Sequence, residues 1–88
     1  MKEIKVRVVD PVGLHARPAT VAVSAANKCN CDVAIHYNGR QIDMKSIMAV
    51  MSLGVPSQAE INIVCNGEDE EKAIEIIEEL LRDQKIVI

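Results

Sequence analysis

The chain has 88 residues, enough for one domain with a modest core, so we expect residues 1–88 to form a single domain. Apolar residues make up 49% of the chain, with one Tyr and neither Phe nor Trp, which predicts an aliphatic core. A net charge of −3 and the lack of aromatic stacking residues argue against a protein that binds nucleic acid directly.

The first ten residues alternate charged and apolar side chains and contain no long hydrophobic run. They fit neither a signal peptide nor a membrane span, so we expect a cytoplasmic protein without membrane insertion. Ile4, Val6 and Val8 alternate with Lys5 and Arg7, the period-two pattern of a half-buried strand. The chain is therefore predicted to begin with a strand.

Small apolar residues at steps of three and four predict a helix from residue 16 to about residue 27. Its predicted buried face consists of Ala16, Ala19, Ala22, Val23 and Ala26. Because these side chains are small, the helix can lie close to a sheet.

Apolar residues alternate over 33–37 and again over 42–44, on either side of Asn38-Gly39. Asn-Gly is the dipeptide that a two-residue type I′ hairpin prefers, so these two strands are expected to pair directly. Ser46 can cap a short helix over 47–52, which Gly54 and Pro56 would end. A fourth strand is predicted around Ile61, Ile63 and Cys65.

Asp69 can cap a last helix, whose first turn is acidic. Its predicted apolar stripe consists of Ala73, Ile74, Ile77, Leu80 and Leu81. The apolar segment Lys85–Ile88 either docks against the domain or forms a small contact surface, and we favour docking. The order βαββαβα predicts an α/β (α+β) two-layer open-faced sandwich, a four-stranded antiparallel sheet with three helices on one face.

The stretch Gly13-Leu14-His15-Ala16-Arg17-Pro18-Ala19 places an imidazole at the start of the first helix. An exposed helix start directs unpaired N–H groups and positive dipole charge outward, which suits an anion. A neutral imidazole nitrogen is also a nucleophile that can carry a phosphoryl group. On spacing alone, a histidine just before a helix is more often a capping or loop residue than a nucleophile, and Arg17 could equally be a surface arginine. If this helix start is an anion site, the guanidinium of Arg17 would bind phosphate. The backbone N–H groups of Ala16 and Arg17 would be the other donors to the phosphate.

On the residues alone we favour Ser46 as a plain N-cap, but both roles can hold, because a phosphoserine at a helix start is electrostatically compatible with the fold. The helix after it has more apolar side chains than one face can bury, so some are expected on the surface. The alternative is a helix wholly embedded in the core. The predicted partner-binding patch consists of Thr20, Ile47, Met48 and Met51.

Residues 13–19 and 45–54, their spacing and the chain length together resemble HPr, the histidine-containing phosphocarrier family of the bacterial sugar phosphotransferase system. The resemblance covers nearly the whole chain, and the second segment resembles the Gram-positive type. It implies the same fold, His15 as the phosphohistidine, Arg17 as the residue that stabilises the phosphate, and Ser46 as a regulatory phosphorylation site.

The same resemblance implies the partners. Enzyme I would donate to Nδ1 of His15, and a sugar-specific IIA domain would accept from it. An HPr kinase/phosphorylase would modify Ser46, and catabolite control protein A would recognise that form. We expect a monomeric carrier without cofactor or metal and without catalytic turnover of its own. The alternatives are a regulatory relative that works only through Ser46, against which the intact His15-Ala16-Arg17 argues, and a nucleic-acid-binding module.

Cys29, Cys31 and Cys65 cannot all pair within one chain, so we expect buried, reduced thiols. With His36 they could be taken for a metal site, but the Cys-x-Cys spacing does not match a zinc knuckle. His36 is expected on the solvated face of a strand. Two departures from the family pattern are Pro11-Val12 before Gly13, which stiffens the loop, and Cys29 where an aromatic residue is often found.

Overall fold

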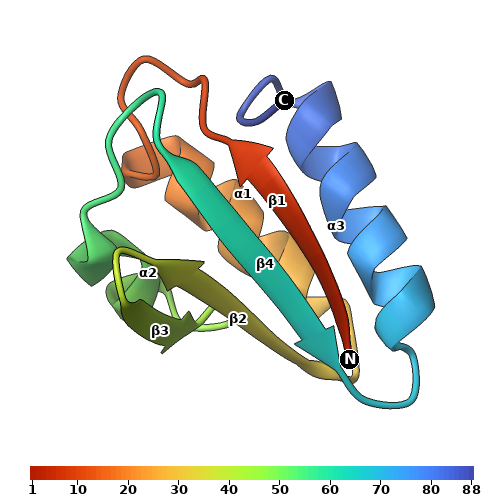
Figure 1. The fold of residues 1–88 in the computed structure, drawn as a ribbon. Helices are drawn as coiled ribbons and strands as arrows, with labels where there is room; N and C mark the ends of the chain where they lie inside the picture. The colour runs from red at the N-terminus through yellow and green to blue at the C-terminus, as the bar shows by residue number, and fades with distance from the viewer.

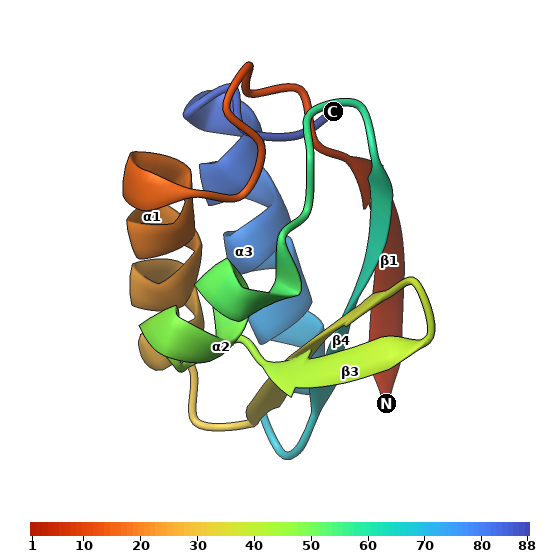
Figure 2. The same ribbon diagram turned by 90° about the vertical axis from the view of Figure 1, so that its left-hand side faces the viewer.

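The computed structural model describes residues 1–88 and has the predicted element order. Its strands are β1 (Lys2–Arg7), β2 (Asp32–Tyr37), β3 (Arg40–Asp43) and β4 (Glu60–Asn66), and its helices are α1 (Ala16–Asn27), α2 (Ile47–Leu53) and α3 (Glu70–Asp83). The strands form one antiparallel sheet in the order β1-β4-β2-β3. All three helices lie on one face of the sheet and leave the other uncovered, as Figures 1 and 2 show. The predicted fold class is confirmed.

Period-two alternation in the strands determines which side chains meet the helices. Ile61, Ile63 and Cys65 of β4 and Ile35 of β2 point inward and are at most 2% exposed. Together with the inward residues of the helices they form one aliphatic core. None of the three helices combines the length and the apolar character needed to cross a bilayer.

The buried face of α1 differs from the predicted one. Its buried residues are Pro18, Ala19, Ala22, Ala25 and Ala26. Ala16 is exposed because it is the first residue of the helix and lies at the surface, and Val23 is only half-buried. The small-residue character of the face is nevertheless as predicted, and α1 packs against α2 and α3.

Three local predictions are confirmed by backbone angles or by a side-chain hydrogen bond. Asn38 and Gly39 have φ of 52° and 79°, the two positive values that a type I′ turn needs, and they join β2 directly to β3. Ser46 caps α2, since its Oγ accepts the N–H of Ala49 at 3.2 Å. Gly54 ends the helix in the left-handed conformation at φ 65°.

The predicted cap of α3 is only half right. Asp69 is the N-cap residue by position, but its side chain makes no capping hydrogen bond. Its Oδ2 instead accepts the N–H of Asn30, at 2.9 Å, in the loop after α1. That bond lowers the pKa of the Asp69 carboxyl. At the start of α3 it is the side chain of Glu70 that accepts a backbone hydrogen bond, from the N–H of Gly67.

The segment after α3 docks, as predicted. Lys85 reverses the chain at φ 59°, and Ile86 and Val87 are then 1% exposed in the core. Arg7 and Ile88 exchange two backbone hydrogen bonds of 3.0 and 2.9 Å, so the segment extends the edge of β1. The end of α3 is thereby held beside the loop that leads from β1 to α1 (Figure 1).

Candidate functional site

The start of α1, the β1–α1 loop, the last turn of α3 and residues 84–88 gather at one end of the molecule (Figures 1 and 2). His15 directly precedes α1 and so belongs to this end. It is the N-cap residue of α1 and is exposed. Its Nδ1 accepts the N–H of Ala16 at 3.1 Å. Because Nδ1 accepts, the neutral ring has its proton on Nε2, and the Nδ1 lone pair is directed toward the start of the helix.

Ala16 has an unusual backbone conformation next to this histidine. Its φ is 47°, in the left-handed region that costs a residue with a Cβ about 1–2 kcal/mol. The surrounding structure must therefore hold it there. The N–H of Ala16 points at the imidazole, whereas the N–H of Arg17 is in the first helical turn, where no intrahelical acceptor exists.

The loop before His15 is supported by a second loop, residues 54–59. The N–H of Leu14 donates to the carbonyl of Val55 at 3.0 Å, and the Leu14 side chain is 2% exposed. Gly13 has φ 76°, and a Cβ there would be 2.3 Å from the same carbonyl oxygen. Asp10 closes the turn, with Oδ1 accepting from Val12 and its carbonyl accepting from Gly13. The position of His15 thus depends on contacts far away in sequence.

Arg17 extends from α1 toward the end of α3. Its Nη2 donates to Oε1 of Gln84 at 3.2 Å, and no hydrogen bond or ion pair joins it to His15 or to a carboxylate. Sequence reasoning did not identify Gln84. No local signal marks it, since it is an exposed polar residue at a helix end, 67 positions from its partner.

The residues of the predicted partner-binding patch differ in exposure. Met48 is 80% and Ile47 38% exposed, so the helix is not wholly embedded in the core. Met51 is half-buried and packs against the core. Thr20 is exposed on α1, with its Oγ1 donating to the carbonyl of Ala16. Both helices are on the same side of the molecule in Figure 2.

Ser46 is not part of the His15 site. The side chain of Asn27, at the far end of α1, donates to the carbonyl of Lys45 at 3.1 Å, which places Ser46 beside that end. Since α1 has 12 residues, about 18 Å of helix separates Ser46 from His15. The two predicted phosphorylation positions therefore lie near opposite ends of one helix.

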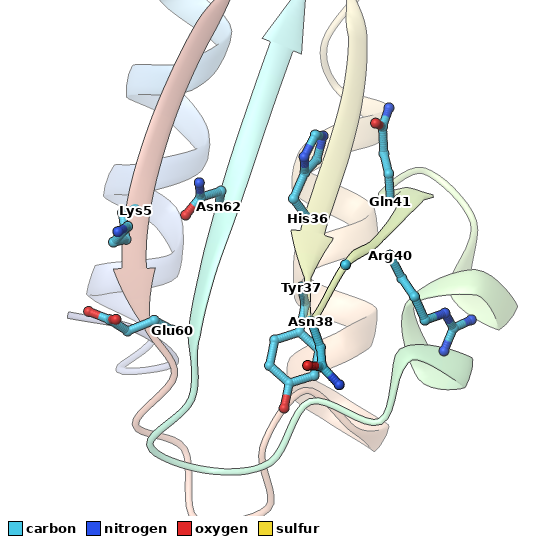
Figure 3. Close-up of a pocket in the computed structure, with 9 residues that line it drawn as sticks. Lys5, His36, Tyr37, Asn38, Arg40, Gln41, Glu60 and Asn62 are labelled. Atoms are coloured by element: carbon cyan, nitrogen blue, oxygen red, sulfur yellow. The ribbon is translucent and has the colours of Figure 1, made fainter.

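The hollows of the surface lie elsewhere. One, of about 480 Å³, lies on the uncovered face of the sheet, where Lys5, His36 and Asn62 come from three different strands (Figure 3). Gln41 and the hairpin turn border it. His36 is exposed there, as predicted. His15 instead stands at an open end of the molecule and lines none of these hollows.

The three cysteines are buried as free thiols. Burial raises the pKa of each, and the pKa of Cys65 rises to about 12. His36 faces outward from the opposite side of the sheet, so it does not join them. No three His, Cys, Asp or Glu side chains converge in a way that could hold a metal ion.

The fold and this end of the molecule define a class: a small open-faced α/β protein with an exposed histidine capping a helix and an arginine two residues later. The family described as the PTS HPr component phosphorylation site matches residues 2–83. The chain belongs to the PTS HPr family, and its role is that of a phosphocarrier in the sugar phosphotransferase system.

Solved structures of HPr and related proteins support this family membership. HPr from Thermoanaerobacter tengcongensis is 35% identical, with a TM-score of 0.91 over 98% of this chain and 96% of its own. The histidine-containing phosphocarrier protein of Mycoplasma is 35% identical, with a TM-score of 0.93 over 98% of both chains. Crh, the catabolite repression protein of Bacillus subtilis, is 37% identical, with a TM-score of 0.73 over 96% of this chain and 97% of its own; it forms an intertwined, domain-swapped dimer.

Proposed function

We propose that this chain relays a phosphoryl group from phospho-Enzyme I to sugar-specific IIA domains through Nδ1 of His15. The observation that carries the proposal is the orientation of the imidazole. Its Nδ1 lone pair is directed toward the start of α1, and the ring is exposed to a partner. A phosphoryl group on that nitrogen would meet the positive end of the helix dipole.

The transfer step follows from this geometry. The Nδ1 lone pair attacks phosphorus, the bond from phosphorus to the donor breaks, and the Nε2 proton stays in place. As the lone pair becomes the N–P bond, the N–H of Ala16 loses its acceptor and donates to a phosphoryl oxygen instead. The N–H and guanidinium of Arg17 are the further donors. Transfer to a IIA domain reverses these changes.

An exposed site suits a carrier. A phosphoryl group that must leave again cannot be stabilised much more strongly than in its donor or acceptor. One arginine and two helix amides at the surface provide moderate stabilisation, and two different partners can reach the ring in turn. We expect no independent turnover, and we propose that residues 1–88 act as one domain and as a monomer.

Labelling tests the relay. Incubation with phosphoenolpyruvate and Enzyme I should add one phosphoryl group, stable to base and labile to acid, as a phosphoramidate of imidazole is. His15→Asn keeps a capping side chain and should abolish the label. His36→Asn changes the other histidine, on the far face, and should be labelled like the parent. A label that survives His15→Asn would show that the acceptor is another residue.

We also propose that Ser46 is a regulatory phosphorylation site for an HPr kinase/phosphorylase, and that catabolite control protein A recognises the product. Ser46 is half-buried, and its Oγ already accepts the N–H of Ala49. A phosphate there would meet the positive end of α2 and would border exposed Met48. It would change the surface offered to partners while leaving the helix start favourable.

The likeness to Crh supports a second candidate, a catabolite regulator that works only through Ser46. The two candidates differ in one result. A phosphocarrier passes its label on to a IIA domain, whereas a purely regulatory protein takes no label from Enzyme I and is modified by ATP and the kinase alone. The intact His15-Ala16-Arg17 sequence favours the carrier.

A further inference from the structure

The face of the sheet that the helices leave uncovered, on the right in Figure 2, holds a second hollow, of about 540 Å³. Side chains of all four strands line it: Glu3 from β1, Val64 from β4, Ala34 from β2 and Asp43 from β3. Because successive side chains of a strand alternate between its two faces, these four point away from the helices and the core. His15 does not line this hollow.

The register of the strands places the four residues in one straight row. Glu3 is paired with Val64 of β4. Ala34 of β2 is paired with Val64 on one side and with Asp43 on the other. The row therefore has a carboxylate at each end and two apolar side chains between them. With neighbouring strands about 4.8 Å apart, about 14 Å separates the Cα atoms of the two ends.

Val64 and Ala34 form an apolar floor in the middle of the row. Val64 is only 8% exposed although it faces away from the helices, and it does not belong to the core cluster. Ala34 is half-buried. An apolar part of a ligand that lies against these methyl groups would remove apolar surface on both sides from water.

The carboxylates around this floor have no cation as a partner. Glu3, Asp32 and Asp43 take part in none of the four ion pairs of the chain. Glu3 accepts a hydrogen bond from the side-chain amide of Asn62, and Asp43 accepts the backbone N–H of Lys45. Each carboxylate therefore keeps lone pairs for a further donor.

The cations near the hollow are bound elsewhere or unpaired. Nζ of Lys45 donates to the carbonyl of Cys29 at 2.9 Å, and the amino group of Met1 pairs with Glu70. Lys5, in the neighbouring row of the same face, forms no ion pair. No cation of the chain thus neutralises the three carboxylates by direct contact, which favours a cationic ligand there.

The spacing of the carboxylates decides which kind of cation fits. A metal ion needs several ligands that converge on one point, and no three His, Cys, Asp or Glu side chains do so in this chain. The carboxylates of the row are instead separated by the apolar floor. A linear molecule with ammonium groups joined by methylenes has the same order of charged and apolar parts.

From this match we propose that the hollow binds a linear polyamine. One ammonium group pairs with Glu3 and a second with Asp43, and the methylenes between them lie over Val64 and Ala34. Charge-assisted hydrogen bonds at both ends fix the direction of the chain across the strands. The inference does not depend on the relay through His15, because binding requires neither phosphorylation nor Enzyme I.

Titration with spermidine at low salt, followed by the backbone amide signals in NMR spectra, tests the site. The signals of Val64 and Ala34 should shift and saturate with a Kd of about 1 mM. Glu3→Gln and Asp43→Asn each remove a charge but keep an acceptor, and each should weaken binding about five- to tenfold. Glu75→Gln removes the same charge from α3 and should weaken it less than about twofold. Positions 3, 43 and 75 are exposed, so these variants are expected to fold.

Two other probes distinguish a polyamine site from a general attraction of cations. Butylamine has an apolar chain but one ammonium group, so it should bind at least about tenfold more weakly than spermidine. Mg²⁺ has the charge without the methylenes, so at equal ionic strength it should neither shift the signals of Val64 and Ala34 to saturation nor displace spermidine.

Three results would overturn the proposal. Shifts that stay linear in spermidine concentration, or that are as large along α3 as at Val64, would show only a loose atmosphere of counter-ions. Equal weakening by Glu3→Gln and Glu75→Gln would show that net charge alone matters. Displacement of spermidine by an equal concentration of Mg²⁺ would show that the apolar floor contributes nothing to recognition.

Discussion

Two residues near His15 adopt backbone conformations that most residues avoid, and their reasons differ. Gly13 at φ 76° has the carbonyl of Val55 where a Cβ would be, so only glycine fits. Ala16 carries a Cβ at φ 47° in spite of the strain, and its N–H donates to Nδ1 of the imidazole. The first is a steric requirement of packing two loops together, while the second orients a donor toward the nitrogen proposed to react.

Gly13→Ala should therefore be far more disruptive than the same change at an open turn. We expect a loss of about 2–4 kcal/mol in the free energy of unfolding, since the strain of a positive φ adds to a clash with backbone. Gly39→Ala, where nothing lies within 4 Å, should cost about 1 kcal/mol. Urea unfolding compares the two, and equal losses would mean that the loops separate easily.

Arg17→Ala should leave stability nearly unchanged, because the side chain is exposed and makes one hydrogen bond. Transfer from phospho-Enzyme I should slow by about ten- to a hundredfold as charge-assisted bonds to the phosphoryl group are lost. Arg17→Lys keeps the charge without the planar fork of the guanidinium, so its transfer rate should lie between those of the parent and Arg17→Ala. Rapid-quench kinetics measure this, and unchanged rates would mean that the helix amides suffice.

Among the elements, α1 separates the two proposed phosphorylation positions, and this determines how one can influence the other. About 18 Å of helix lies between them, roughly twice the distance of about 8 Å over which salt screens charges at physiological ionic strength. A charge on Ser46 therefore acts weakly on His15 directly. Under the proposed regulation, an effect on transfer would arise where a partner covers the exposed side chains of Ile47 and Met48 as well as His15.

Two substitutions at Ser46 should separate capping from regulation. Ser46→Asp keeps a capping oxygen and suits the helix dipole, so thermal stability should be unchanged. The rate of phosphoryl transfer from Enzyme I should fall, and added salt should partly restore it. Ser46→Ala should lose about 1 kcal/mol of stability and leave transfer unchanged. Unfolding curves and transfer rates measure both. If Ser46→Asp transfers like the parent, Ser46 is a structural cap only.

At the scale of the whole molecule, the buried thiols should make the stability of the core sensitive to high pH. The core is aliphatic except for three thiols. Burial disfavours the thiolate and therefore raises the pKa of each of them. Cys65, with its side chain fully enclosed, has its pKa raised from 9.0 to about 12. Unfolding exposes these thiols to water, where they ionise at their ordinary pKa.

The free energy of unfolding should therefore decline above pH 9. A folded pKa above the unfolded one contributes stability that is complete below about pH 9 and is lost as pH rises toward about 12. Each such thiol steepens the decline by up to about 1.4 kcal/mol per pH unit. Urea unfolding between pH 8 and 10 should show a shallower slope for Cys65→Ala than for the parent. Parallel slopes would place the cause in other groups.

Much of this protein could be predicted from its sequence, because the signals involved are local. Alternation and helical spacing predicted the order of the elements, Asn38-Gly39 predicted a turn that its own backbone angles satisfy, and Ser46 predicted a cap three residues away. The candidate reacting group and its arginine also stand in one short segment, so they could be recognised before any fold was known.

Other features were decided only by the tertiary structure, because they join residues that packing brings together. The carboxylate of Asp69 accepts a hydrogen bond from Asn30 and none at the start of its own helix. Position 13 needs glycine because the carbonyl of Val55 occupies the place of a Cβ. Arg17 found an acceptor in Gln84 only because residues 86–88 dock beside β1 and hold the end of α3 near the start of α1. The sequence alone thus determined which groups are present, whereas long-range packing decided which of them meet.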